Sequence, residues 1–552
     1  MRRKMIVAAG LMLAAMAPAR AEQTLIENVR GYTVQGDTLA RFDALLVGDD
    51  GRVAAVGPKA RSTAAPSVRR IDGGGKVLLP GLIDAHGHVG GLGEVLRSLD
   101  LSETRSLADA QKAIADYAAA RPDQPWITGA GWNQEIWGLG RFPTAAEIDA
   151  VVPDRPVWLE RVDGHAGWAN GKALALAGIT RETKDPDGGR IERDAEGNPT
   201  GVFVDAAMKL VTRVVPERSE AERAEALQAA LDHLASLGLT SVHDAGISKG
   251  DVALYRRFAD DGRLTARVYA MIADVGQDFA DLSAQGPLLG YGGDRLTVRS
   301  VKLFADGALG SRGAALRQPY SDDPKNSGLL FEDAAGMERK VEAALKAGYQ
   351  VNVHAIGDAG NGQVMDAFEA AYAKVGGREL RNRIEHAQVV AVDDIPRFKT
   401  LGLVASMQPT HATSDMNMAE DRVGPDRIRG AYAWRTILNQ GTVIAAGSDF
   451  PVESANPFYG LHAAITRTDR EGRPIGGWHA EQAMTPFEAF RAFTLDAAYA
   501  AHQEAQLGSL EPGKWADFIL VDQDIFAIDP HTIWRTKVIE TWVGGQRVYP
   551  KT

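Results

Sequence analysis

The 552-residue chain contains no cysteine. This absence excludes disulfide bonds, a thiol nucleophile and a cysteine-ligated zinc site. Any bound metal ion would therefore be held by histidine and carboxylate side chains, or by a less common ligand. A chain without cysteine is compatible with an oxidising compartment, although this alone is no evidence for export.

The chain also lacks an excess of positive charge, because its formal net charge is −11. Outside its first four residues it contains no run of basic side chains. Both features argue against nucleic acid or another polyanion as a partner. The acidic balance favours solubility and does not identify a substrate.

The first residues resemble a secretion signal. Residues 2–4 are basic, residues 5–17 are apolar, and residues 19–21 have the small-x-small pattern of a cleavage site. The apolar stretch is too short to span a membrane comfortably, and an uncleaved anchor is the alternative. We predict a signal peptide over residues 1–21, a periplasmic or secreted mature protein, and no stable membrane insertion after cleavage.

The two ends of the chain have the same pattern of short strand-like runs. Residues 22–80 and 496–552 contain short apolar or alternating runs between turn signals, with no helical period, and are predicted to meet in one small β-sandwich domain. Residues 81–495 alternate strand-like and helix-like segments. About eight such units favour a closed (β/α)8 barrel of the α/β class over an open sheet. A tryptophan-rich stretch, about 122–215, breaks the alternation and is interpreted as an insertion in the barrel.

The segment His86-Gly87-His88 closes an apolar strand-like run. Side chains two residues apart on a strand point the same way, so both imidazoles can reach one ion. Four later apolar runs also end in polar or ionisable residues. Because barrel active sites lie at the C-terminal ends of the strands, we expect six side chains to converge on one rim: His86, His88, Lys302, His354, His386 and Asp449.

Imidazole nitrogen and carboxylate oxygen are suitable ligands for zinc and related divalent ions. One histidine alone is more often structural, but ligand-type residues at several strand ends indicate a metal centre. Lys302 differs, because an ammonium group repels a cation. A lysine buried beside a metal can lose its proton and form a carbamate with carbon dioxide, and an ion pair with a carboxylate such as Asp306 is the alternative.

Seven stretches together resemble the amidohydrolase superfamily, in particular the amidohydrolase-3 branch of N-substituted formamide deformylase-like and exoenzyme-regulatory-protein-like hydrolases. They run from about residue 24 to residue 548: VLLPGLIDAHGHV, VKLFADGALGSR, VNVHAIGDAGN, RIEHAQ, GSDFPVE, MTPFEAFRAFTLDAAYA and LGSLEPGKWADFILVD. The resemblance implies a barrel with a β-sandwich made from both termini.

The resemblance also implies one or two divalent ions, expected to be zinc. The five histidine and aspartate positions named above match metal-site positions of the family, and Lys302 matches its bridging, carboxylated lysine. With two ions, His86, His88 and Asp449 would hold one, and His354 and His386 the other. Asp449 is also the predicted general acid and base, which takes a proton from metal-activated water and passes it to the leaving nitrogen.

Five further residues are predicted to serve the substrate. His165 is a catalytic candidate that binds substrate or stabilises an oxyanion, with a structural role in the insertion as the alternative. Arg312 would bind a substrate carboxylate or form a salt bridge within the protein. Asp306, His411 and Trp132 are predicted pocket residues, although tryptophans in such numbers more often pack a core.

The predicted activity is hydrolysis of a non-peptide C–N bond in a small amide, N-acyl or formamide-type substrate. An ester or lactone hydrolase on the same metal centre is the first alternative, because a metal-bound hydroxide attacks several electrophiles. A non-catalytic exported binding or regulatory protein is the second alternative. A homodimer is expected only because two-fold assemblies are common.

Overall fold

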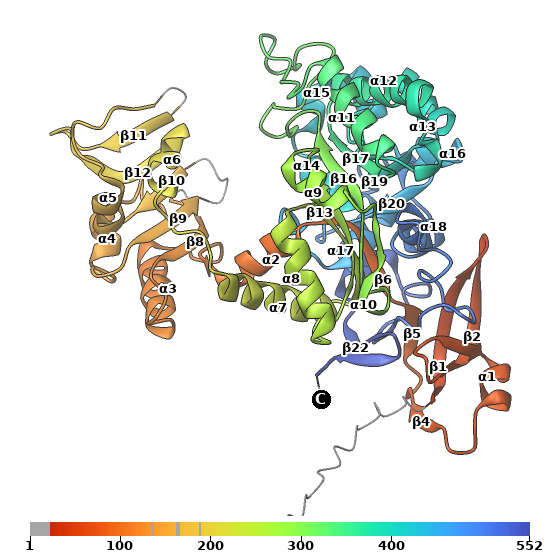
Figure 1. Cartoon of the computed structure of the whole chain (residues 1–552). Coiled ribbons are helices and arrows are strands. Elements are labelled where there is room, and N and C mark those ends of the chain that lie inside the picture. The colour runs from red at the N-terminus through yellow and green to blue at the C-terminus, as the bar shows by residue number, and fades with distance from the viewer. Residues whose placement is uncertain (1–22, 135, 162–165, 187–188, 552) are drawn as a thin grey trace, which may run out of the picture.

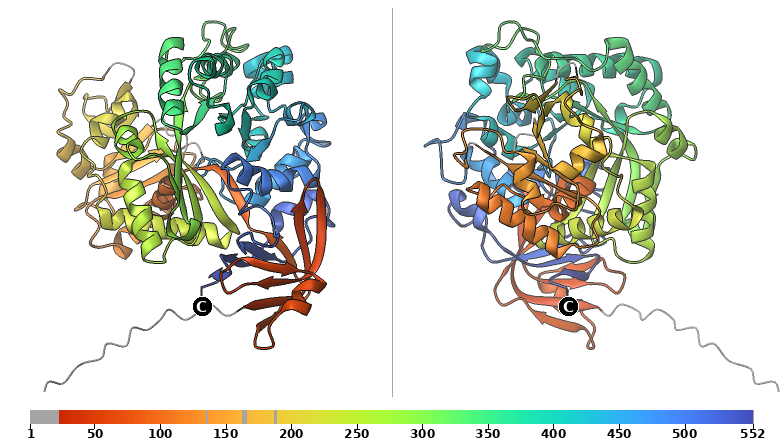
Figure 2. Two further views of the ribbon diagram at one scale, coloured as in Figure 1. Left: turned by 45° about the vertical axis from the view of Figure 1, so that its right-hand side comes forward. Right: turned by 90° about the vertical axis from the view of Figure 1, so that its left-hand side faces the viewer.

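A computed structural model describes residues 23–134, 136–161, 166–186 and 189–551 (Figure 1). The predicted signal peptide and His165 lie outside the described residues. The described chain forms three parts: a barrel, a sheet at one end of the barrel, and a lobe beside it (Figure 2). None of the described helices has the length and apolar character needed to span a membrane.

Both ends of the chain meet in one sheet, as predicted. The described strands run in the order β23-β22-β21-β5-β1-β2-β3, with β4 beside β1. The two chain ends join where β21 pairs antiparallel with β5, so that Phe518 lies opposite Pro80. The strands are β1 (Thr24–Gln35), β2 (Thr38–Val47), β3 (Val53–Val56), β4 (Arg69–Asp72), β5 (Val77–Pro80), β21 (Phe518–Val521), β22 (Val538–Val543) and β23 (Gln546–Tyr549).

The central sheet is the predicted parallel barrel. Its described parallel strands follow the order β20-β19-β18-β17-β16-β14-β13-β6, and a bridge between Gly87 and Phe450 brings the first and last strands together. The strands are almost wholly buried, as in parallel sheets covered by helices, but their buried residues include charged ones such as Lys302, Arg383 and Glu385. They are β6 (Leu82–Gly87), β13 (Leu239–Ile247), β14 (Arg267–Ala273), β16 (Leu296–Phe304), β17 (Gln350–Ala355), β18 (Arg383–His386), β19 (Val404–Met407) and β20 (Ile444–Ala446); β15 (Leu288–Gly290) is antiparallel to β16.

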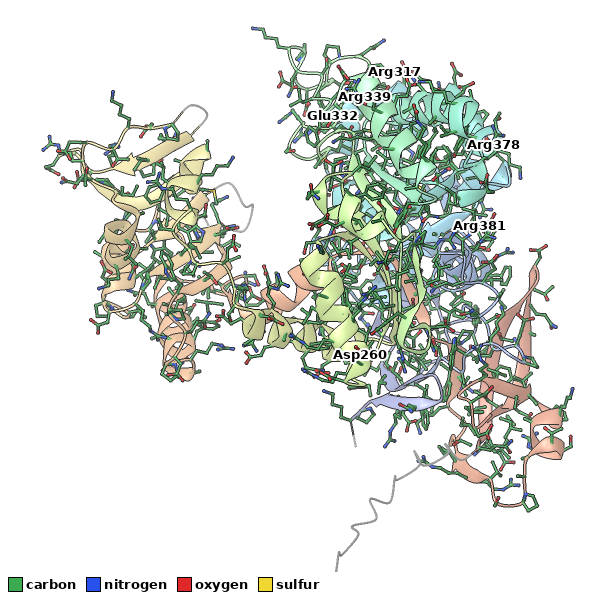
Figure 3. All side chains as sticks on the ribbon, in the orientation of Figure 1. Asp260, Arg317, Glu332, Arg339, Arg378 and Arg381 are labelled. Atoms are coloured by element: carbon green, nitrogen blue, oxygen red, sulfur yellow. The ribbon has the colours of Figure 1, made fainter. Side chains whose placement is uncertain are left out.

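Helices cover the outside of the barrel (Figure 1). Local signals fix their starts: Ser219 and Glu222, for example, form a capping box that satisfies the first backbone N–H groups of α7. Charged side chains such as Arg339 and Arg378 lie on the outer, exposed surface (Figure 3). The helices include α2 (Val89–Arg97), α7 (Glu220–Ser236), α8 (Lys249–Asp260), α9 (Gln277–Ser283), α11 (Ala334–Lys346), α12 (Asp358–Val375), α13 (Ile395–Leu401), α14 (Pro409–Asp415), α15 (Ala419–Arg427), α16 (Trp434–Asn439), α17 (Pro457–Thr466), α18 (Pro486–Ala492) and α19 (Leu495–Ala500).

The insertion forms the lobe, which has a separate sheet in the order β11-β12-β10-β9-β8-β7. This sheet begins at Leu99, earlier than the expected start near residue 122. Helix α3 also packs in the lobe core. The elements are β7 (Leu99–Asp100), β8 (Ile127–Trp132), β9 (Val157–Arg161), β10 (Ala166–Ala169), β11 (Gly189–Arg193), β12 (Pro199–Asp205), α3 (Leu107–Ala120), α4 (Ala145–Asp149), α5 (Gly171–Ala177) and α6 (Lys209–Thr212).

Candidate metal centre

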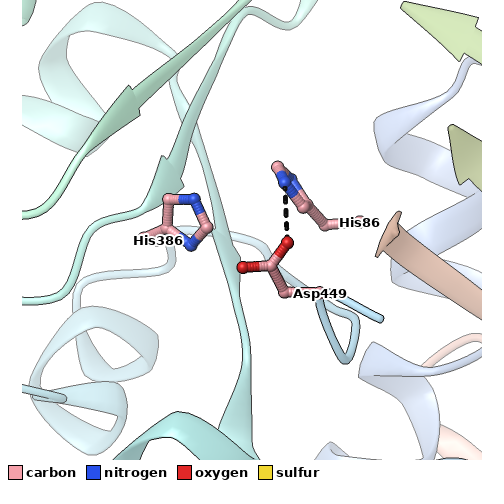
Figure 4. A group of neighbouring side chains, drawn as sticks. All are labelled: His86, His386 and Asp449. Carbon is pink, nitrogen blue, oxygen red and sulfur yellow. Dashed lines mark ion pairs between the residues drawn. The ribbon is translucent and has the colours of Figure 1, made fainter. Parts of the chain in front are cut away.

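The barrel strands bring histidines and an aspartate together at their C-terminal ends. His86 lies near the end of β6, His354 near the end of β17 and His386 at the end of β18, while Asp449 follows β20. His86, His386 and Asp449 each offer a ligand atom within 4.8 Å of the others (Figure 4). The His354 and His386 rings lie 4.5 Å apart between centroids. These side chains come from strands far apart in sequence and meet only because the barrel closes.

Asp449 is the centre of the cluster. Its Oδ1 lies 3.1 Å from Nε2 of His88 and 3.5 Å from Nε2 of His86. Its Oδ2 lies 3.7 Å from Nε2 of His411. His411, on α14, also stacks on His386 with the ring planes 18° apart. The structure therefore brings together the aspartate, the predicted histidine ligands His86, His88 and His386, and the pocket candidate His411.

Three of the ligand-type histidines have their second ring nitrogen held by a protein acceptor. Nδ1 of His86 lies 2.5 Å from Oε2 of Glu385, and Nδ1 of His386 lies 2.8 Å from Oε1 of Gln408. Nδ1 of His88 lies 2.8 Å from the carbonyl oxygen of Ala245. Such bonds fix the ring orientation and leave Nε2 facing the cluster, as in histidine–metal sites. Glu385 and Gln408 were not among the predicted site residues; the position of a glutamate on a short strand-like run, directly before His386, was the available signal.

The backbone at the rim is tightly constrained. The Asp84 carboxylate accepts hydrogen bonds from the backbone N–H of His86 and from the N–H and hydroxyl of Ser448, which joins β6 to the segment after β20. A Cβ at Gly447 would lie 2.5 Å from the backbone nitrogen of His86, so only glycine permits this approach. His386 and Asp449 have positive φ angles of 74° and 62°. Strained conformations of this kind concentrate at functional sites, where surrounding structure holds them in place.

Burial sets the protonation of the cluster. It lowers the pKa of His86 and His386 well below the usual value, so both imidazoles are neutral. Burial, with the nearby charge of Lys302, lowers the pKa of His354 to about 4. Burial opposes ionisation of Asp449, but the hydrogen bond with His88 lowers its pKa well below the usual range. Neutral imidazoles beside a carboxylate are the forms that bind a cation.

Lys302 faces the same cluster. Its side chain is 1% exposed, and its Nζ lies 3.3 Å from Nε2 of His86. Among the described residues, no carboxylate lies within 4.0 Å of Nζ, so the ion pair with Asp306 is absent. Burial lowers the pKa of Lys302.

The donor set fits a divalent metal. Nε2 of His354 and Nε2 of His411 are buried and lack a hydrogen-bond partner among the described residues. A buried imidazole nitrogen without a partner is costly unless a ligand satisfies it. Together with the three ligand atoms within 4.8 Å, these nitrogens match the nitrogen and oxygen donors that divalent metals prefer.

A cavity of about 410 Å³ opens beside the cluster. Its described lining comprises His88, Lys302, Phe304, Ala308, Leu309, Gly310, His354, Ile356, His386, Gln388, His411, Asp415, Asp449, Val452 and Glu453. The cavity therefore gives a small molecule access to the candidate ligands, and His411 is among the residues that line it.

Three predicted substrate residues lie elsewhere. Asp306 is fully buried, and its carboxylate accepts three backbone N–H groups from residues 315, 356 and 357, so it organises loops instead of contacting substrate. Burial raises the pKa of Asp306 to about 6. Arg312 forms a two-bond salt bridge with Asp322, the alternative that the sequence left open.

Trp132 was predicted to bind substrate, but it lies in the lobe. It is completely buried, packs against Trp168, and donates its indole N–H to the carbonyl oxygen of Leu159 at 2.8 Å. Its side chain belongs to the apolar core under the lobe sheet. The sequence could not separate an aromatic wall from an aromatic core, because both use the same residues.

Comparisons with known proteins agree with the geometry. The amidohydrolase family model matches residues 69–549. A Bacillus subtilis protein named as an amidohydrolase, YtcJ, is 34% identical to this chain. The match covers 94% of this chain and 98% of YtcJ. N-substituted formamide deformylase of Arthrobacter pascens is 28% identical over 96% of this chain and 98% of its own. The crystal structure of a metal-dependent hydrolase of Pyrococcus horikoshii OT3 has a TM-score of 0.78 and 28% identity, and covers 92% of this chain and 99% of that one.

Proposed function

The chain belongs to the amidohydrolase family and is a metal-dependent hydrolase, and on that premise we propose that it cleaves a non-peptide carbon–nitrogen bond, with zinc as its metal. The observation that carries the proposal is the buried group of His86, His386 and Asp449, whose ligand atoms lie within 4.8 Å beside a cavity. The similarity to a formamide deformylase supports an amide, N-acyl or formamide-type substrate.

In this proposal, His86, His88 and Asp449 hold one ion, and His354 and His386 hold a second where two are bound. When bound, a divalent ion lowers the pKa of water and polarises a carbonyl group. The protein contributes rings already fixed by Glu385 and Gln408. Preorganised ligands of this kind avoid reorganisation when the substrate arrives.

Asp449 is proposed as the general base and then the general acid. Its carboxylate is ionised and only 7% exposed, so it is ready to accept a proton from water in the cavity. It would then donate that proton to the leaving nitrogen, because an amide anion is a very poor leaving group. His411, whose Nε2 lies 3.7 Å from Oδ2 of Asp449, would donate a hydrogen bond to the carbonyl oxygen as negative charge develops.

Lys302 is proposed to be carboxylated. Its amine faces His86 without a carboxylate partner within 4.0 Å among the described residues. Addition of the neutral amine to carbon dioxide forms a carbamate and releases one proton. The product is an anionic oxygen donor directed at the cluster, which replaces the repulsion of an ammonium group with attraction for a cation.

The first test is metal content measured on the purified full-length chain, together with turnover of a panel of N-formyl and N-acetyl amides and matched esters. We expect one or two ions per chain and amine release that a chelator abolishes and added zinc restores. Ester cleavage without amide cleavage would replace the C–N assignment. Failure to bind zinc, manganese, iron or cobalt after reconstitution would overturn the metal centre.

A further inference from the structure

The cavity beside the metal centre is lined by two chemically different sets of residues. One set is apolar and comprises Phe304, Leu309, Ile356 and Val452. Phe304 and Val452 are 45% and 69% exposed, so part of this set is open to solvent. An apolar wall of this kind accommodates a hydrocarbon portion of a ligand and gives no charge selectivity.

The other set is polar and includes two acidic residues, Asp415 and Glu453, together with Gln388. The only lysine or arginine among the described lining residues is Lys302, which is buried against His86. Arg312, the cation expected to bind a substrate carboxylate, is paired with Asp322. The acidic lining residues therefore disfavour an anionic ligand group and favour a cationic one.

Asp415 is held in a fixed orientation. Its Oδ2 accepts hydrogen bonds from Nε2 of Gln388 at 2.6 Å and from the hydroxyl of Tyr432 at 2.5 Å. Its Oδ1 has no hydrogen-bond partner among the described residues. Burial raises the pKa of Asp415, while the hydrogen bonds from Tyr432 and Gln388 oppose this effect. An approaching cation would also lower the pKa of Asp415 and so favour its ionised form.

The position of Asp415 on its helix also sets its distance from the reacting centre. Asp415 and His411 are four residues apart on α14, so they share a helix face. Four residues of helix rise about 6 Å. Since His411 lies against Asp449, Asp415 marks a point about one helical turn away from the reacting centre. A group bound there would be joined to the scissile bond by a short chain.

We propose that Asp415, together with Glu453, which also lines the cavity, binds a protonated amino group of the substrate. The substrates would then be amides whose nitrogen substituent carries an amine at the end of a short alkyl linker. This inference rests on the proposed C–N hydrolase function. It adds the chemical class of the substrate and a specificity-determining residue, and it separates such amides from N-acyl amino acids, whose carboxylate the acidic lining residues repel.

A matched set of three amides tests the inference on the zinc-loaded full-length protein. The set is N-acetyl-1,4-diaminobutane, neutral N-pentylacetamide and anionic 4-acetamidobutanoate, which differ mainly in the terminal group. We expect kcat/KM to be highest for the ammonium compound by about tenfold or more, because charge-assisted hydrogen bonds are among the strong ones. Preference for the anion, or no preference for the ammonium compound over the neutral one, would overturn the inference.

Two variants assign the preference to residues. Asp415→Asn is nearly isosteric and should reduce the ammonium-to-neutral ratio of kcat/KM by about tenfold; Glu453→Gln should reduce it less. Asp426→Asn removes the same charge from an exposed position on α15 and is the matched control, in which the wild-type ratio is expected. A wild-type ratio in both Asp415→Asn and Glu453→Gln, with native circular dichroism spectra, would overturn the assignment.

Binding measurements separate failure of this inference from failure of the proposed function. If none of the three amides is hydrolysed, C–N cleavage of this amide class is contradicted. Calorimetric titration of the same unreacted compounds then tests the site directly. A dissociation constant about tenfold lower for the ammonium compound, lost in Asp415→Asn, would support the amino-group site. Equal binding of the ammonium and neutral compounds would overturn it.

Discussion

The barrel rim and the lobe both concentrate side chains that suggest a binding site, histidines in one and tryptophans in the other. Their contacts differ. In the lobe, the indole N–H groups of Trp132 and Trp168 donate to backbone carbonyl groups at 2.8 and 2.9 Å. At the rim, Nε2 of His354 and Nε2 of His411 are buried without a partner among the described residues.

This difference separates packing from binding. A buried polar atom that is satisfied within the protein contributes to a stable core, whereas one that is unsatisfied carries a free-energy cost until a ligand arrives. The packed aromatic core therefore stabilises the lobe. The rim instead holds neutral imidazoles and an ionised Asp449 in a buried setting that a cation would stabilise.

Substitution of Asp449 should have the largest effect on the rim. Asp449→Asn removes the proton acceptor while keeping a similar shape, so turnover should fall by about 10²- to 10⁴-fold. The protein should still bind metal through its histidines. Steady-state kinetics and metal analysis on the same preparation check this, and turnover equal to that of the unmodified protein would contradict the general-base role.

Substitution of Trp132 tests whether the lobe tryptophans serve packing and not binding. Trp132→Ala should lower the free energy of unfolding by about 3–5 kcal/mol, because it leaves a cavity in a packed core. Metal content should stay at the level of the unmodified protein, since the residue lies in the lobe core and not at the rim. Chemical denaturation and metal analysis measure both quantities. If Trp132→Phe, which keeps most of the volume, raises KM without loss of stability, Trp132 contacts substrate after all.

Substitution of Lys302 should have an intermediate effect on metal binding and turnover. Lys302→Ala should weaken metal binding by about 10- to 100-fold and lower turnover, because a ligand or a ligand-orienting group is lost. Added acetate or propionate should restore part of the activity by supplying the missing carboxylate. Lys346→Ala, at a lysine that is 59% exposed, is the matched control. Full metal content in Lys302→Ala would contradict carboxylation.

Arg312 should have the smallest effect. Its salt bridge with Asp322 is partly exposed, with side-chain exposures of 33% and 23%, and such pairs contribute about 1 kcal/mol or less. Arg312→Ala should therefore leave KM for uncharged amides within about twofold and reduce stability only slightly. A large rise in KM confined to carboxylate-bearing substrates would restore its predicted role in substrate binding.

Several features of the fold and site could be predicted from sequence because they are local. Apolar runs that end in His86-Gly-His88, His354 and His386 identify buried strands, and parallel strands in a barrel present their ends to one rim. The strand-like residue pattern at both chain ends was enough to predict the terminal sheet. These inferences need only periodicity and residue type.

The barrel, the terminal sheet and the residue types at the strand ends thus follow from local sequence patterns. Which atoms meet follows only from the folded chain: Glu385 holds His86 across 299 residues of chain, and Trp132 packs inside the lobe. In the folded chain Asp415 also lines the cavity, while the carboxylate of Asp306 accepts hydrogen bonds from backbone N–H groups. Periodicity is encoded within a few neighbouring residues, whereas the partner of a side chain depends on how the barrel closes and on the packing of distant elements.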